Sequence, residues 1–253
     1  MATSAGNAVE KVLRVLDGLA DHSRLSDLSR DAELPKSTVH RILQTLVAEG
    51  FATYDERAGG YTPGARLLGL AGRTLGRLDV ASGAEPVLRS LQRRTGATVH
   101  LAVLSGDEAV YVQKLEGSKP YRMVSRVGMS IPLHCTGIGK AILAGLPDAE
   151  VTLLLARTGM PARTPSTITE VDRMLEDLAG VRQRGWSRDD QENEAGIVCA
   201  GAGVRDHTGA TIGAVSVSQL ATDPERVELD ELGPWVAVTA REVSAAFGAP
   251  KTA

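Results

Sequence analysis

The chain has 253 residues, a net charge of −3 and 43% hydrophobic residues, with aromatic residues at only 3%, so its core must be aliphatic. That length is enough to bury a sizeable core and favours two domains. No apolar run approaches the roughly 20 residues of a membrane helix, and the N-terminus lacks the basic-then-apolar pattern of a signal peptide. Two cysteines are too few for a disulfide framework. We therefore expect a cytoplasmic protein that contacts no membrane.

The N-terminal part predicts three helices. Apolar residues recur with helical spacing from Val9 to Leu19 and predict the first helix. A short second helix follows, with Ser26 as its expected N-cap. A tight break over residues 33–35 leads into a third helix, which gives the order helix–short turn–helix.

The third helix has an apolar side and a donor-rich side. Pro35 suits its first turn, and Gly50 is the expected stop because glycine adopts the left-handed conformation after a helix. The apolar stripe consists of Val39, Ile42, Leu43, Leu46 and Val47, and the other side exposes Lys36, Ser37, Thr38, His40, Arg41 and Gln44. Donors crowded at the N-terminal end of a helix with an apolar back are typical of entry into the major groove of DNA. The alternative is an ordinary amphipathic helix with a solvated face.

Two β-prone runs at 51–54 and 61–62 then enclose a Gly-rich tip that carries Arg57. Three helices followed by a hairpin is the order of a winged helix-turn-helix, in which Arg57 would reach a phosphate or the minor groove. We therefore predict that residues 1–64 are a DNA-binding domain with Lys36, Ser37, Thr38, His40, Arg41 and Arg57 as the residues that contact DNA.

The charge of this domain points to a dimer. Residues 1–64 hold seven basic and nine acidic side chains, a net charge of −2, whereas nucleic-acid modules usually show a basic footprint. Few phosphate contacts per subunit imply weak non-specific binding. Two copies with their helices in successive grooves of a palindromic double-stranded operator would compensate.

A helix is predicted from about 65 to 79 by the spacing of Leu67, Leu68, Ala71, Leu75 and Leu78. Three glycines within it weaken an isolated helix by about 1 kcal/mol each, so it needs a partner surface. We expect residues 65–80 to form a linker that packs against its copy in a dimer. The alternative is a helix folded back on its own domain.

The remainder, residues 81–253, mixes helices and strands. Tight turns at 105–107 and 206–209 join neighbouring strands, so the sheet should be largely antiparallel and the fold class α+β. Helices are predicted at 84–94, 136–146, 151–157, 169–184 and 225–247, strands at 99–104, 109–115, 122–127, 186–188, 196–205 and 211–220, and a loop at 128–132.

One part of this domain suggests a ligand site. Residues 135–141 place Gly-rich backbone at the start of a helix, where free N–H groups and the helix dipole attract an anion. It is not a nucleotide loop, because the first glycine of that motif would fall at His134. Period two puts Ile197 and Cys199 on one strand face, and Ile212, Ala214, Ser216 and Ser218 on another. If both faces look the same way, they form a cup that suits a small carboxylate or a similar polar metabolite. The alternative is a core face whose small residues are satisfied internally.

Catalysis is not expected. His134, Cys135 and Cys199 suggest a thiol nucleophile or a metal site, but the histidines and cysteines show neither HExxH nor CxxC spacing. The acidic cluster over 189–194 would offer paired carboxylates, although such clusters on loops are usually solvated. We therefore predict no enzyme activity, no metal and no cofactor.

Four stretches in the same order resemble the IclR family of bacterial transcriptional regulators. They are VLRVL (12–16) with LPKSTVHRIL (34–43), IPLHCTGIGKA (131–141), GWSRDDQENEAGIVCA (185–200) and GAVSVS (213–218). The resemblance implies a winged helix-turn-helix, a linker helix and a GAF-like effector-binding domain over 81–253. It also implies homodimers or dimers of dimers on palindromic operators.

The resemblance further implies an effector pocket. In family members with organic-acid ligands, which range over glyoxylate, pyruvate and aromatic acids, the pocket lies where this sequence has Ile131, Gly137, Ile138, Asp189, Ile197, Cys199, Ser216 and Ser218. The second residue whose backbone amide lines this pocket is often alanine in the family. In this sequence it is Ile138, whose larger side chain adds bulk. We expect a ligand-responsive regulator, a repressor rather than an activator. The alternatives are a C-terminal domain that serves oligomerisation without a ligand, and an enzyme fused to a DNA-binding module.

Overall fold

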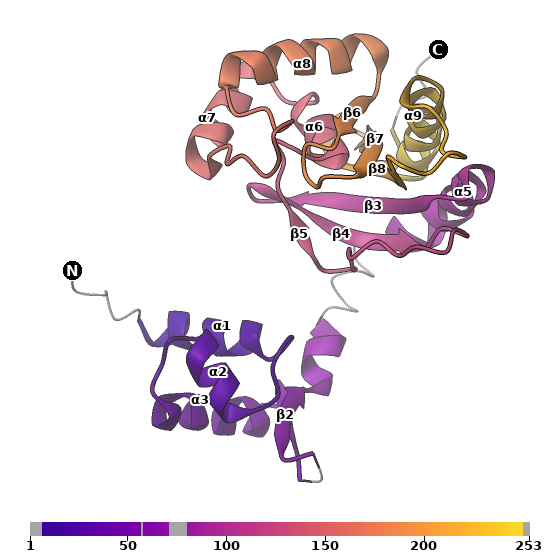
Figure 1. Ribbon diagram of the computed structural model, residues 1–253. Coiled ribbons are helices and arrows are strands. Elements are labelled where there is room, and N and C mark those ends of the chain that lie inside the picture. Colours follow the sequence, from indigo (N-terminus) through magenta and orange to yellow (C-terminus); the bar gives the residue numbers. More distant parts are fainter. Residues whose placement is uncertain (1–6, 57, 71–79, 250–253) are drawn as a thin grey trace. The chain divides into compact units, whose positions relative to one another are not determined.

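The computed structural model describes residues 7–56, 58–70 and 80–249, and the chain divides into two compact units, Met1–Leu78 and Asp79–Ala253 (Figure 1). Within the described residues, no helix has the length and apolar character that a membrane span requires. The two units are considered one at a time.

The first unit packs helices against a short hairpin. The strands of this hairpin are antiparallel, with Ala52 opposite Pro63. Val15, Leu28 and Val39, each from a different helix, meet in the core of the unit. The elements in chain order are α1 (Ala8–Gly18), α2 (Leu25–Asp31), α3 (Lys36–Ala48), β1 (Ala52–Asp55) and β2 (Gly60–Pro63), and residues 65–70 are again helical. This arrangement confirms the predicted winged helix-turn-helix.

Some details at the helix ends differ from the sequence prediction. Ser26 lies inside α2 and is not its N-cap; that position is taken by Arg24, whose side chain makes no capping bond. Pro35 is the N-cap of α3 rather than a first-turn residue, since its carbonyl accepts the Thr38 and Val39 amides. The left-handed conformation expected at Gly50 is confirmed by its φ of 73°.

The buried stripe of α3 is narrower than predicted. Val39, Leu43 and Leu46 are buried, whereas Ile42 is only half-buried and Val47 is exposed. The elements packed on α3 are α1, α2 and β1, and they leave the Val47 flank open to solvent. The remainder of the predicted linker helix, residues 71–79, lies outside the described residues.

The second unit is built on an antiparallel sheet of the order β5-β4-β3-β8-β7-β6. The central pair joins β3 to β8, so residues 98–103 lie against 213–218. The strands are β3 (Thr98–Ser105), β4 (Glu108–Leu115), β5 (Ser130–Ile131), β6 (Ser187–Asp190), β7 (Ile197–Arg205) and β8 (Thr211–Leu220). The predicted α+β class is confirmed.

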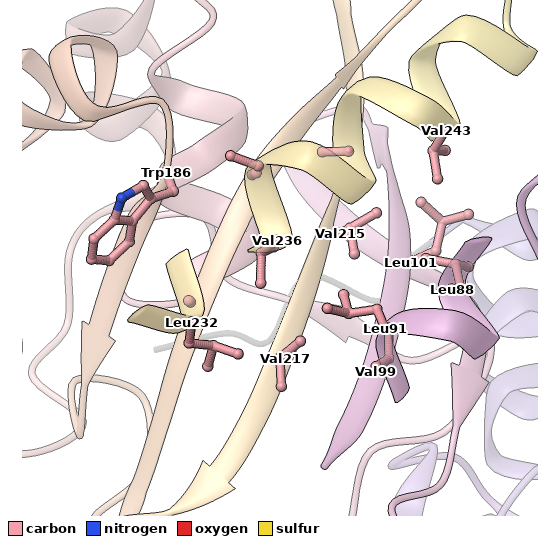
Figure 2. Close-up of a cluster of buried hydrophobic side chains, with 14 of the residues drawn as sticks. Leu88, Leu91, Val99, Leu101, Trp186, Val215, Val217, Leu232, Val236 and Val243 are labelled. Carbon is pink, nitrogen blue, oxygen red and sulfur yellow. The ribbon is translucent and has the colours of Figure 1, made fainter. Parts of the chain in front are cut away.

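Helices cover both faces of this sheet, so alternate residues of each strand enter two different cores. On one face, Val99, Leu101, Val215 and Val217 pack against leucines and valines of α5 and α9 (Figure 2). On the other, Ala102 and Ala214 pack beneath α6. The helices are α5 (Val80–Thr95), α6 (Gly137–Leu143), α7 (Asp148–Thr158), α8 (Val171–Arg184) and α9 (Leu229–Ala246).

Two predicted elements of this unit were wrong. Residues 122–127 form no strand; the Lys114 ammonium donates to the carbonyls of Met123 and Ser125, both at 2.7 Å, so a side chain holds this segment instead of a ladder. The strand on that edge is β5, within the predicted loop. The last helix starts at Leu229 and not at 225, because the Gln219 amide holds both backbone groups of Val227 outside it.

Candidate DNA-binding and effector sites

The outer side of α3 presents most of the predicted DNA-contacting residues together. Lys36, Ser37, His40 and Arg41 are exposed within its first two turns, and Thr38 is half-buried. Arg57, the sixth residue of that prediction, lies outside the described residues. A single α-helix that displays cations and hydroxyls along one side has the chemistry of major-groove readout.

Two features that hold α3 in place carry little sequence signal. The turn before it passes through Glu33, a non-glycine residue with φ of 51°, and the Ser29 hydroxyl donates to the Leu34 carbonyl at 2.6 Å. After the helix, Arg66 donates to the Glu49 carbonyl and carboxylate, the latter at 2.7 Å. Arg66 therefore neutralises the acidic side chain at the end of α3 and ties it to the helix that begins at 65.

In the second unit, the strand faces of the predicted cup look the same way, except that Ile212 packs against the cluster on the other side of the sheet. Cys199 of β7 lies opposite Ser218 of β8, and Asp189 of β6 lies opposite Cys199. Residues directly opposite each other in an antiparallel pair share a face. The Cys199 thiol donates to the Ser218 hydroxyl over 3.2 Å, which joins two of the predicted effector residues.

Helix α6 closes this face from above through an unusually close backbone contact. A Cβ on Gly201 would lie 2.3 Å from the carbonyl oxygen of Gly137, so β7 has no room for a side chain at this position. The Ser187 hydroxyl lies between the carbonyls of these two glycines and donates to them. The absence of a side chain at Gly201 therefore allows α6 to lie this close to the sheet.

The free helix-end amides expected from the sequence are fewer than predicted. Thr136 is the N-cap of α6, and its hydroxyl accepts the Gly139 amide at 2.9 Å. Only the amides ahead of Gly139 remain for a ligand. Of the other predicted residues, Ile131 and Ile138 are buried in one apolar cluster, while Ile197 is half-buried at the start of β7.

Asp189 is the most strongly perturbed acid of the cup. It is 3% exposed, and its Oδ1 accepts the Glu192 amide at 2.9 Å. Burial raises the pKa of Asp189 to about 7. The interpretation of 189–194 as a solvated acidic cluster is therefore wrong for Asp189 and for Glu192, which is also buried. Both are inside because the following loop folds back over the cup.

A buried ion cluster behind the cup was missed in the sequence. Lys140 of α6 is 1% exposed, and its ammonium lies 2.5 Å from Glu192 Oε1 and 3.0 Å from Asp177 Oδ2 of α8. Burial raises the pKa of Glu192 although the Lys140 charge opposes this. The available signal was a single lysine within the otherwise small and apolar helix GIGKAIL.

The loop after β6 is held by a second segment, residues 163–167. The Thr164 hydroxyl donates to the Gln191 carbonyl, and the Thr167 hydroxyl donates to that of Glu192, both at 2.6 Å. Arg163 adds a bond to the Asn193 carbonyl at 3.2 Å. The cup is thus covered by α6 and by this pinned loop.

A cavity of about 720 Å³ lies elsewhere in the second unit, between the ends of α6, α8, α9 and β7. Trp186, Arg205 and Arg241 are on its wall, and none of the predicted effector residues is. Within the described residues, no group of three or more His, Cys, Asp or Glu side chains is placed to hold a metal ion.

Comparisons with known proteins agree across almost the whole chain. The family models "IclR helix-turn-helix domain" and "Bacterial transcriptional regulator IclR C-terminal" match residues 8–56 and 72–245. The HTH-type transcriptional regulator XynR of Escherichia coli K12 is 33% identical, with 96% of this chain and 98% of XynR covered. The HTH-type transcriptional repressor AllR of the same strain is 31% identical over 98% of this chain and 93% of AllR.

A solved structure extends this likeness to a liganded protein. An IclR homolog from Microbacterium hydrocarbonoxydans, complexed with 4-hydroxybenzoate, superposes with a TM-score of 0.82 at 25% identity. The alignment covers 95% of this chain and 99% of that one.

Proposed function

Because the chain belongs to the IclR family, and is therefore a DNA-binding transcriptional regulator rather than an enzyme, we propose that it is a repressor released or engaged by a small organic acid. Residues 1–64 would bind the operator, 65–80 would link and pair two copies, and the GAF-like part over 81–253 would bind the effector. The repressor AllR and the division of the chain into two compact units support this assignment.

For DNA we propose that Lys36, Ser37, Thr38, His40 and Arg41 enter the major groove and that Arg57 touches the backbone from the wing. The exposed donors on α3 and the pairing of Glu49 by Arg66 support this interface. The net charge of −2 over residues 1–64 supports a dimer, or a dimer of dimers, on a palindromic operator.

The observation that carries the effector proposal is the buried polar face of Asp189, Cys199 and Ser218 beneath α6. Small-molecule sites are mostly apolar with a few convergent polar groups, which is the composition of this face. The proposed effector residues are Ile131, Gly137, Ile138, Asp189, Ile197, Cys199, Ser216 and Ser218. The relative in complex with 4-hydroxybenzoate supports an organic acid as the ligand class.

The test uses Cys199→Ser combined with Ser218→Ala. We expect a thermal-shift screen with glyoxylate, pyruvate and 4-hydroxybenzoate to find an acid that stabilises the wild type and changes its affinity for the promoter of its own gene. The double variant should keep its promoter affinity and lose that response, because the bonded thiol–hydroxyl pair is gone. Ser90→Ala, on the exposed side of α5, is the matched control.

An unchanged acid response in the double variant would refute the site. Promoter binding that ignores every acid, in the wild type as well, would favour the alternative in which the second unit serves only for oligomerisation.

Affinity for an anionic acid should also fall as the pH rises through 7. Since the pKa of Asp189 is raised to about 7, an anion bound beside it favours the protonated carboxyl, and binding takes up a proton. Well above that pH, the dissociation constant should rise by about tenfold for each pH unit. Calorimetry in buffers of different ionisation enthalpy measures the proton uptake. Asp189→Asn should flatten the dependence, and an affinity independent of pH in the wild type would exclude this linkage.

A further inference from the structure

The cup continues beyond the predicted residues onto β3 and β4, where a buried polar atom lacks a partner. His100 is 2% exposed; its Nε2 lies 2.7 Å from the Ser125 hydroxyl, and its Nδ1 has no hydrogen-bond partner. Ser216 of β8, also buried, and the half-buried Tyr111 of β4 place two further hydroxyl groups on these strands. Buried polar atoms are rarely left unpaired, since each costs about 1–3 kcal/mol.

These atoms belong to one continuous face. His100 lies directly opposite Ser216, which in turn lies opposite Gly201 beneath α6. The His100 and Tyr111 rings stack with centroids 4.6 Å apart and an interplanar angle of 32°. Tyr111 lies opposite Ala102 of β3 and packs against the apolar cluster beneath α6, so it is on the same side of the sheet as the cup.

The imidazole acts here as a neutral group. Burial, and then the Lys114 charge, lower the pKa of His100 to about 3, so one ring nitrogen donates and the other accepts. Because the Ser125 hydroxyl can take either role, the Nδ1 atom is free to match a ligand hydroxyl or a ligand oxygen. The stacked ring of Tyr111 adds a flat surface beside it.

We infer that His100 and Tyr111 are specificity-determining residues that select a planar, ring-bearing acid over a two- or three-carbon keto acid. This inference rests on the effector cup proposed above. The ring would lie against the Tyr111–His100 pair, with a polar ring substituent bonded to His100 Nδ1 and Ser216. Ser216 and Ser218 are two residues apart on β8, a span of about 7 Å. A substituted six-membered ring covers such a span, whereas glyoxylate or pyruvate does not.

The experiment measures the dissociation constants of benzoate, 4-hydroxybenzoate, 3,4-dihydroxybenzoate, glyoxylate and pyruvate by calorimetry on the full-length protein. We expect at least one hydroxylated ring acid to bind about tenfold or more tightly than either keto acid. His100→Phe keeps an aromatic ring but removes Nδ1, and should weaken that acid about tenfold while affecting benzoate less. Ser125→Ala is the matched control, because it removes the bond to Nε2 and leaves Nδ1 in place.

A second readout does not depend on the stability of a variant. In wild-type protein with ¹⁵N-labelled histidine, the ring acid should shift the His100 nitrogen resonances, which are identified by their absence in His100→Phe. Unshifted resonances, or His100→Phe binding with wild-type affinity, would overturn the inference. Keto acids that bind in the cup while ring acids do not would overturn it and leave the proposed function standing. If no acid of either kind binds, both fail.

Discussion

Lys140→Met should destabilise the effector-binding domain by about 3–5 kcal/mol, the usual cost of removing one partner from a buried ion pair. The variant leaves the carboxylates of Glu192 and Asp177 without the ammonium that faces them at 2.5 and 3.0 Å. Methionine fills a similar volume, so the loss reports charge rather than a cavity. Urea denaturation followed by circular dichroism gives the free energy of unfolding.

The pH dependence separates this mechanism from poor packing. A carboxyl whose pKa is higher in the folded state than in the unfolded state costs stability as the pH rises through that range. Burial already raises the pKa of Glu192, and without Lys140 it rises further, so the deficit should be largest at neutral pH and shrink on acidification. Glu192→Gln added to Lys140→Met should recover part of the stability.

Lys119→Met is the matched control for the same change of side chain. Lys119 pairs with Asp223 and Glu225 at the surface, where water screens the charges, so this variant should unfold much like the wild type. Equal losses at positions 140 and 119, or a Lys140→Met deficit that does not vary with pH, would show that the buried ion cluster is not what stabilises the domain.

Arg41→Ala should weaken operator binding about 30-fold or more. A side chain that reads a base is worth about 1–3 kcal/mol, and a dimer on a palindrome loses it twice. Fluorescence anisotropy with promoter DNA at fixed salt measures the effect, and calorimetry with the effector should show unchanged acid binding. Arg89→Ala removes the same charge from the exposed side of α5 and should leave operator affinity intact. An Arg41→Ala protein that binds the operator like the wild type would remove α3 from the interface.

The first unit was predictable from sequence because its signals are local. Helical spacing gave α1 and α3, and a glycine after α3 gave its end at Gly50. The errors arose where a local preference was overridden: Ser26 has the chemistry of an N-cap, but the chain enters α2 two residues earlier. Glu33 adopts a left-handed backbone conformation, which its residue type alone does not predict.

The second unit was predictable strand by strand, but not in how its strands and loops meet. Period two placed Cys199 and Ser218 on their faces, and the structure supplied the pairing that joins them. Residues that complete the cup or its support, such as His100 and Asp177, are distant in the sequence from the predicted site residues, and only the sheet register and the packing of α8 bring them there. Local patterns contain no information about such contacts.

The contact between Gly137 and Gly201 also bears on how regulators with new effectors could be engineered from this chain. Along that seam the backbones touch, so a side chain at Gly201 would push the helix off the sheet, and substitution there should destabilise the fold. Other parts of the cup boundary consist of side chains, among them Ile138, Ile131 and Tyr111, and substitution can change their size. A biosensor library should therefore keep the glycine seam constant and diversify the side-chain boundary, where each change alters the shape of the cup and leaves its frame unchanged.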